Sequence, residues 1–98
     1  MPKVCRTGDL GATGHLCNPM IGVFATQGSV FANGIPLARL GDPTKPHFIP
    51  LGPICVGHMS KVKSSSRTVF ARGIGVARIG DAYDMGRMIK GAPNVFAG

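Results

Sequence analysis

Apolar residues along this chain come in short runs that Gly and Pro interrupt. Fifteen Gly and eight Pro are spread over 98 residues. Each interior Gly costs an α-helix about 1 kcal/mol and each Pro about 3 kcal/mol, so no window of the usual length supports an amphipathic helix. The pattern excludes an all-helical fold. The hydrophobic content of 44% argues against a disordered chain.

The apolar pattern repeats along the chain. Residues 30–42 align with residues 69–81 at an offset of 39, and nine of the thirteen positions are identical. Partial copies lie at the two ends. Residues 95–98 match the Val-Phe-Ala opening of the unit, and residues 5–9 match its Ala-Arg-x-Gly-Asp ending. The two termini together make a third unit, and repetition of this kind dictates the architecture.

Each full unit has the pattern of a β-hairpin. A Val-Phe-Ala strand leads into a turn at Asn33-Gly34 or Arg72-Gly73, and a second strand ends in Gly-Asp. Asn-Gly is the strongest short hairpin signal, because a type I′ turn needs φ > 0 at both central positions. We therefore predict an all-β fold in a single domain, residues 1–98, with three equivalent hairpins around one pseudo-threefold axis.

Three segments differ between the units. Each leaves a Gly-Asp and returns to a Val-Phe, so the symmetry of the repeats should gather them at one end of the molecule. These variable segments are Leu10–Ser29, Pro43–Thr68 and Ala82–Asn94.

All three histidines lie in the variable segments, together with two of the three cysteines. Zinc favours tetrahedral coordination by nitrogen and sulfur, and Cys-x-x-His lets one tight turn present two ligands. The alternative, ordinary loop histidines and small buried thiols, is favoured for any one of these residues taken singly. As a set they predict a structural metal site, zinc by preference with iron not excluded. Its first-choice ligands are His15, His47, Cys55 and His58, with Cys17 competing for the thiolate place.

Cysteine usage and the N-terminus indicate a cytoplasmic origin. The residues after Met1 lack the apolar stretch of a signal peptide, and no apolar run approaches the roughly 18 residues that span a bilayer. An odd number of cysteines in a reducing compartment makes a disulfide framework unexpected. Cys5 occupies the repeat position of Ala38 and Ala77, so we expect a small buried residue there and no ligand.

The chain is strongly basic. Eleven Lys and Arg against four Asp give a net charge of +7, which suits nucleic acid, a lipid head-group surface or an acidic protein. Lys61, Lys63, Arg67 and Arg72 cluster around Ser64–Ser66. A solvated face is favoured over a nucleic-acid surface, because one Tyr and no Trp leave few stacking platforms. A small metal-stapled nucleic-acid-binding module is the alternative function.

Catalytic chemistry is thinly represented. Cys55 and His58 would make a nucleophilic pair, but Asp84 is the one acidic residue in the variable segments. The Gly-Asp dipeptides recur as strand endings, where an Asp side chain accepts local backbone N–H bonds. A redox or hydrolytic metal enzyme would need an open coordination position and a pocket. We therefore do not expect an enzyme.

Several longer motifs resemble one family. Pro36-Leu37-Ala38-Arg39 recurs as Gly75-Val76-Ala77-Arg78, and Gly14-His15-x-Cys17-x-Pro19 precedes both. The chain closes on Ala92-Pro93-Asn94-Val95-Phe96. Together these motifs cover nearly the whole chain and resemble the PAAR-repeat family, small proteins that tip the spikes of contractile phage tails and type VI secretion systems.

The resemblance implies a sharp, PAAR-type cone of short β-hairpins with pseudo-threefold symmetry and a flat base seated on a trimeric β-helical spike. It also implies a metal held near the vertex by three His and a Cys. Family members often have Cys-Gly after the last Gly-Asp, where this chain has Met85-Gly86. Cys55 or Cys17 must therefore stand in for that ligand.

The function implied is that of a structural tip protein, which caps and sharpens the spike so that contraction pierces the target outer membrane. Without an appended domain, the chain resembles the minimal phage-type tip, carried in the virion, or alternatively a tip secreted with a type VI apparatus. We expect no nucleic-acid partner and no small-molecule substrate. The apolar residues expected to divide between the core and the spike contact are Val30, Phe31, Val69, Phe70, Val95 and Phe96.

Overall fold

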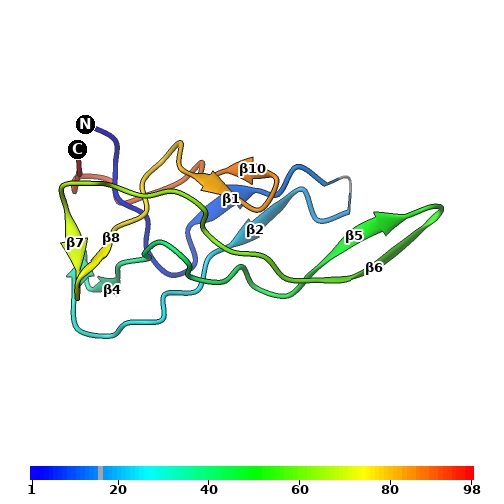
Figure 1. Ribbon diagram of the computed structural model, residues 1–98, viewed down its shortest axis with the longest axis horizontal. Helices are drawn as coiled ribbons and strands as arrows, with labels where there is room; N and C mark the ends of the chain where they lie inside the picture. The colour runs from blue at the N-terminus through cyan, green and yellow to red at the C-terminus, as the bar shows by residue number, and fades with distance from the viewer. Residues whose placement is uncertain (16) are drawn as a thin grey trace.

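Regular structure in the described part of the chain is entirely antiparallel β. The computed structural model describes residues 1–15 and 17–98, and within them ten short strands pair as five hairpins (Figure 1). The predicted all-β fold is confirmed. In chain order the pairs are β1 (Leu10–Ala12) with β2 (Met20–Gly22), β3 (Phe31–Ala32) with β4 (Ile35–Pro36), β5 (His47–Leu51) with β6 (Ile54–His58), β7 (Phe70–Ala71) with β8 (Ile74–Gly75), and β9 (Ala82–Tyr83) with β10 (Gly86–Arg87).

The two complete repeat units form the predicted hairpins. In β3–β4 the turn residues Asn33 and Gly34 have φ of 54° and 76°, and in β7–β8 Arg72 and Gly73 have φ of 52° and 81°. Positive φ at both central positions is what a type I′ turn requires. Asn adopts this left-handed conformation more readily than Arg, so the first turn is the less strained of the two.

The chain termini complete the third unit. The Val4 N–H donates to the Val95 carbonyl at 2.9 Å, which repeats the bond that closes each complete unit. The N- and C-termini accordingly lie side by side at one end of the molecule (Figure 1). The equivalent bonds run from the Leu37 N–H to the Val30 carbonyl at 3.0 Å and from the Val76 N–H to the Val69 carbonyl at 3.1 Å.

A closed triangle of backbone hydrogen bonds marks the pseudo-threefold axis. The Cys5 N–H donates to the Ala77 carbonyl at 2.8 Å, Ala77 donates to Ala38 at 2.9 Å, and Ala38 donates back to Cys5 at 2.9 Å. All three residues are fully buried, as expected for Cys5 from its repeat position. The predicted pseudo-threefold arrangement is therefore confirmed at the level of the backbone.

Each unit ends in the same Gly-Asp corner. Gly8, Gly41 and Gly80 have φ of 88°, 86° and 92°, a conformation that favours glycine. In every unit, the following Asp accepts at Oδ2 the backbone N–H of the residue three positions earlier, at 2.7 Å. These carboxylates have the structural role that the sequence predicts, and they are Asp9, Asp42 and Asp81.

Two clusters of buried side chains fill the body. The first is made largely of equivalent positions from the three units. The second surrounds the triangle and receives Tyr83 and Met88 from the last variable segment. A Cβ at Gly11 would overlap the Tyr83 ring, so the ring packs directly on backbone. The residues of the first cluster are Val4, Ala32, Leu37, Ala71, Val76, Ala92 and Ala97.

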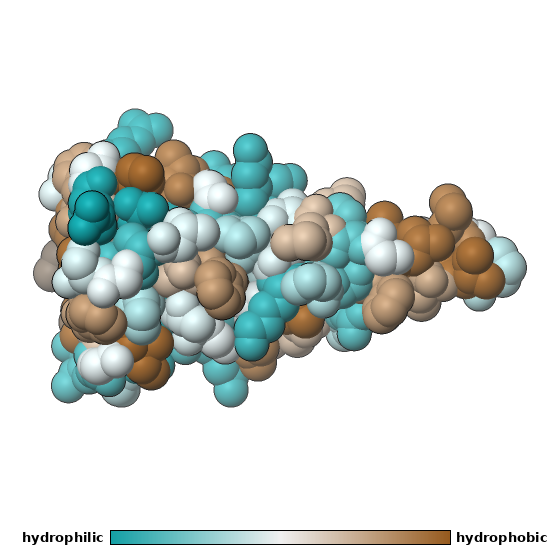
Figure 2. All heavy atoms as spheres, turned by 90° about the horizontal axis from the view of Figure 1, so that it is seen from below, coloured by the Kyte–Doolittle hydropathy of each residue, from teal (hydrophilic) through white to brown (hydrophobic). Residues whose placement is uncertain are grey.

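The molecule tapers along its length. Its principal extents are 42 × 23 × 21 Å. The wide end holds the termini with β3–β4 and β7–β8, and the narrow end is β5–β6 alone (Figure 1, Figure 2). Where the sequence predicts loops, each variable segment forms a hairpin of its own, namely β1–β2, β5–β6 or β9–β10. Among the described residues, no helix is long and apolar enough to cross a membrane.

Enlarging a residue of the triangle should loosen the fold. We expect Ala77→Leu to lower the free energy of unfolding by about 1–3 kcal/mol, because the added atoms have no space around a fully buried position. Chemical denaturation measures the change. Val69→Leu is the control, since Val69 is exposed in the same unit and should tolerate the substitution. Equal stability of the two variants would contradict tight packing at the axis.

Candidate metal centre

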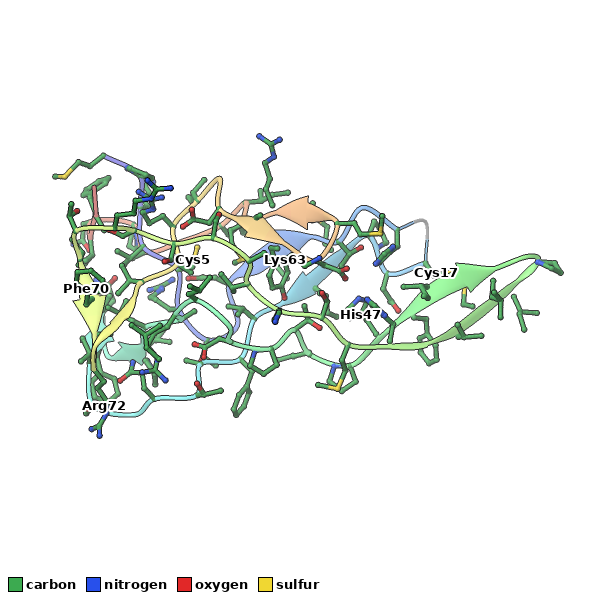
Figure 3. The ribbon with its side chains drawn as sticks, in the orientation of Figure 1. Cys5, Cys17, His47, Lys63, Phe70 and Arg72 are labelled. Carbon is green, nitrogen blue, oxygen red and sulfur yellow. A yellow bond between two sulfur atoms is a disulfide. The ribbon has the colours of Figure 1, made fainter. Side chains whose placement is uncertain are left out.

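Four side chains that can ligate a metal converge where the body meets β5–β6. His15, His47, His58 and Asp84 each offer one ligand atom, and these atoms lie within 4.8 Å of one another. All three variable segments contribute, and Figure 3 shows His47 at the root of β5. The predicted meeting of the three histidines is confirmed.

The β5–β6 hairpin presents two of the imidazoles. His47 and His58 begin and end the paired strands and stand opposite each other in register. Directly opposed residues of an antiparallel pair project to the same face, and the two rings meet edge to face with centroids 5.0 Å apart. Gly52 has φ of 62° at the first position of the Gly52-Pro53 turn, as a type II′ turn requires.

His15 comes from the connection between β1 and β2, which Thr13 organises. The buried Thr13 hydroxyl donates to the Asn18 carbonyl at 2.9 Å and accepts the His15 N–H at 3.2 Å. Gly14 has φ of 81°, and a Cβ there would lie 2.8 Å from the Met85 carbonyl oxygen. Glycine therefore allows this connection to approach the β9–β10 turn.

Asp84 comes from the two-residue turn of β9–β10. Its φ of 56° is left-handed, which Asp tolerates better than most residues. Its N–H donates to the Lys61 carbonyl at 3.1 Å, which ties the turn to the second variable segment. A Cβ at Gly86 would overlap the Ala12 carbonyl, so the absence of a side chain lets the turn lie against β1.

The Asp84 carboxylate lies among the three imidazoles. Its Oδ1 is 3.1 Å from His15 Nε2 and 3.3 Å from His58 Nε2, and its Oδ2 is 2.8 Å from His47 Nε2. Burial raises the pKa of Asp84, but hydrogen bonds from His47, His58 and His15 outweigh it and leave the pKa below its ordinary value. The carboxylate is therefore ionised at neutral pH and available as a ligand.

The His47 ring is oriented for metal binding. Both of its ring nitrogens face oxygen acceptors, since Nδ1 lies 2.8 Å from the Lys45 carbonyl and Nε2 lies 2.8 Å from the Asp84 carboxylate. A neutral imidazole has one N–H and can donate to only one of them. A cation between Nε2 and the carboxylate would leave the N–H on Nδ1 to donate to the carbonyl. A carbonyl that holds the distal N–H is also a usual partner of a metal-bound histidine.

The donor set fits a divalent transition metal. Three imidazole nitrogens and one carboxylate oxygen match the ligands that zinc and similar ions accept. Four protein ligands correspond to the number in closed structural zinc sites. The side chains of His47 and Asp84 are almost fully buried, and that of His58 is the most exposed of the four. The cluster could thus hold a metal ion, as the histidines predict.

The prediction of Cys55 as the fourth ligand, with Cys17 competing, is corrected by the structure. The two cysteines form a disulfide with Cα atoms 6.2 Å apart, so neither offers a thiolate. The Cys-x-x-His spacing suggested one tight turn, but both residues lie in the extended strand β6. Side chains three positions apart in a strand project to opposite faces, so Cys55 is directed away from His58.

The disulfide also departs from the expectation that cysteine count and compartment suggested. It joins the first variable segment to β6, and Figure 3 shows Cys17 beside this hairpin. Cys5 is the cysteine left over, and it is buried and reduced. Its thiol donates to the Lys90 carbonyl at 3.4 Å.

Asp84 is the candidate ligand that sequence reasoning missed. One signal pointed to it, because it is the one Asp outside the three Gly-Asp corners. It also lies in the one variable segment that supplies no histidine. Equivalence of the three segments would have favoured a ligand there.

The apolar residues of the repeat openings divide between core and surface. Val30 and Val95 pack against the first core cluster, and Val69 is 38% exposed. The three equivalent phenylalanines are about half exposed at the wide end, where Figure 3 shows Phe70. Their exposed fractions are 51% for Phe31, 56% for Phe70 and 46% for Phe96.

The sequence matches no model of a protein family and no curated protein sequence.

Separate substitutions distinguish the two sets of candidate ligands. We expect the wild type to hold one divalent ion per chain, and Asp84→Ala to weaken its affinity by at least roughly 100-fold, because a primary ligand is lost. The double variant Cys17→Ser, Cys55→Ser should keep the ion. Native mass spectrometry after zinc loading measures both. Loss of the ion in the cysteine variant with retention in Asp84→Ala would restore the thiolate as ligand.

Thiol titration tests the cysteine assignment. Burial raises the pKa of Cys5, so we expect no thiol to react with Ellman's reagent in the air-oxidised native protein. Denaturant should expose one thiol, and denaturant with prior reduction should expose three. Cys5→Ala is the control, because its repeat equivalents are alanines. In this variant we expect no reactive thiol in denaturant alone and two after reduction. Two reactive thiols in the native protein would contradict the disulfide.

Proposed function

We propose that this chain is the tip protein of a contractile injection spike, of the kind found in phage tail baseplates and type VI secretion systems. The observation that carries the proposal is the hydrogen-bond triangle of Cys5, Ala38 and Ala77. It gives one chain a threefold base, which complements a partner that is itself a trimer. The opposite end of the molecule narrows to one hairpin.

The exposed phenylalanines supply a contact of the required symmetry. Phe31, Phe70 and Phe96 are equivalent in the three units at the wide end, and each follows a valine of the same unit, of which Val30 and Val95 are partly buried. Three equal apolar contacts can meet three equal surfaces on a β-helical trimer, one tip per spike. Large exposed aromatic residues are also the type that dominates binding energy at protein interfaces.

The proposed role of the metal is structural, with zinc as the favoured ion. Tying His15, His47, His58 and Asp84 to one ion would join the three variable segments beyond the end of the core. Ligand binding of this kind adds folding free energy. A narrow end held by coordination would resist splaying when contraction drives it against a target membrane.

Docking on a spike tests this function. Mixed with the trimeric β-helical spike of the same phage or secretion system, the chain should form a complex of one tip per trimer in native mass spectrometry. Phe31→Ser, Phe70→Ser and Phe96→Ser should each weaken it by on the order of 1–2 kcal/mol, since each removes a similar apolar contact. Leu51→Ser at the opposite end is the control. Complexes of other stoichiometry, or indifference to all three base variants, would contradict the proposal.

A further inference from the structure

The hairpin at the narrow end, residues 47–58 and here called the apical hairpin, carries no charged side chain between its histidines. Lys, Arg and Asp are all missing from Pro46 to Ser60. The hairpin projects beyond the body as an apolar extension, the brown narrow end in Figure 2. An apolar surface that a folded protein leaves in water at its extremity marks an interaction site.

The strand register divides the apical hairpin into an inner and an outer part. Cross-strand pairs on the face of the metal ligands run from His47–His58 through Ile49–Val56 to Leu51–Ile54. Ile49 and Val56 are half-buried, whereas Leu51 and Ile54 are 63% and 58% exposed. The apolar side chains are therefore most exposed at the turn, farthest from the body.

The apical hairpin is attached to the body at more than one level. Near its root, the Phe48 N–H donates to the Asn18 side-chain oxygen at 2.9 Å. Farther out, the Cys17–Cys55 disulfide joins it to the first variable segment, since Cys55 is paired with Pro50 close to the turn. His47 and His58 hold it at the metal centre. It is thus a preorganised projection that loses little conformational freedom on binding.

The charge around the root of the hairpin is positive. Lys45 and Lys61 flank it in the sequence and are exposed. None of the four Asp side chains opposes them, because all four are directed to internal partners. An exposed apolar end with two exposed lysines at its root complements a bilayer with anionic headgroups.

We propose that the apical hairpin is a lipid-contact element, with Leu51 and Ile54 entering the boundary between headgroups and acyl chains of an anionic bilayer while Lys45 and Lys61 contact the headgroups. This deepens the proposed spike-tip function by naming the residues that meet the membrane. The argument stands on the apical hairpin and does not use the base.

Backbone chemistry limits how deep the hairpin can go. A two-stranded hairpin has unpaired N–H and C=O groups along both outer edges, which the hydrocarbon core does not tolerate. Five residues per strand reach about 17 Å, roughly half of a 30 Å core. The hairpin is therefore a wedge in one leaflet and does not span the bilayer.

Tryptophan substitution provides a direct test, because the chain contains no Trp. With free protein and vesicles of phosphatidylcholine and phosphatidylglycerol, Leu51→Trp emission should shift to shorter wavelength. Lipids brominated near the headgroup should quench it more strongly than lipids brominated near the bilayer centre. Phe70→Trp at the base, where the parent side chain is similarly exposed, is the matched control and should show neither effect.

Vesicle flotation measures the contribution of each group. Leu51→Ser with Ile54→Ser should weaken binding roughly 10–100-fold, and Lys45→Gln with Lys61→Gln by about tenfold or more on anionic vesicles. Phe31→Ser with Phe70→Ser should leave it unchanged. No shift of Leu51→Trp, equal binding by all variants, or a dimer in sedimentation that the Leu51 and Ile54 substitutions dissociate would overturn the proposal. Because no spike is present, its failure is separate from failure of spike docking.

Discussion

The backbone triangle at Cys5, Ala38 and Ala77 is the constraint on which the rest of the structure depends. Each unit gives one donor and one acceptor to its neighbours, so three buried N–H and three buried C=O groups are satisfied without solvent. An unpaired buried group of this kind costs about 1–3 kcal/mol, which makes separation of one unit unfavourable in both neighbours. With the units fixed at the axis, the three Gly-Asp corners start the variable segments at equivalent places. The threefold base and the convergence of the four candidate ligands both follow from this.

Stabilisation changes in kind along the length of the molecule. Near the axis, apolar burial in two small clusters dominates, whereas at the narrow end neither cluster includes a residue of β5–β6. There the variable segments are joined by specific links. The His15, His47, His58 and Asp84 cluster involves all three segments, and the Cys17–Cys55 disulfide adds a bond between the first and second. In the chain-entropy model, closing a loop across 38 positions contributes roughly 4 kcal/mol. Small domains commonly rely on such links where a core is insufficient.

Most of the fold could be predicted from the sequence, because the repeat is explicit and the turns carry their own signals. Asn33-Gly34 indicated a type I′ turn, and the alignment of Cys5 with two alanines predicted a small buried residue, which the structure places at the axis. The ligand set could be predicted only in part. Whether Cys55 shares a face with His58 depends on whether the residues between them form a turn or an extended strand, and Cys-x-x-His suits both. In the extended strand β6, Cys55 is directed toward Cys17 and forms the disulfide with it. The fourth candidate ligand is Asp84, which has φ of 56° in the turn of β9–β10. That turn has no Gly or Asn at its two central positions, so the usual sequence signal for it is missing. Likewise, the repeated Val-Phe pattern identified apolar positions without deciding which would face solvent.

The two ends of the molecule follow opposite symmetry rules. At the base, Phe31, Phe70 and Phe96 occupy equivalent positions of the three units and are exposed to a similar degree. The narrow end does not repeat this symmetry, because β5–β6 alone forms it (Figure 1). The second variable segment therefore extends beyond the other two, and it supplies both His47 and His58 as well as the apical hairpin. The symmetry is broken at the cluster of His15, His47, His58 and Asp84, so the same four side chains that bring the segments together also lie at the root of the one that projects. A change in this cluster therefore affects both the cohesion and the direction of the narrow end.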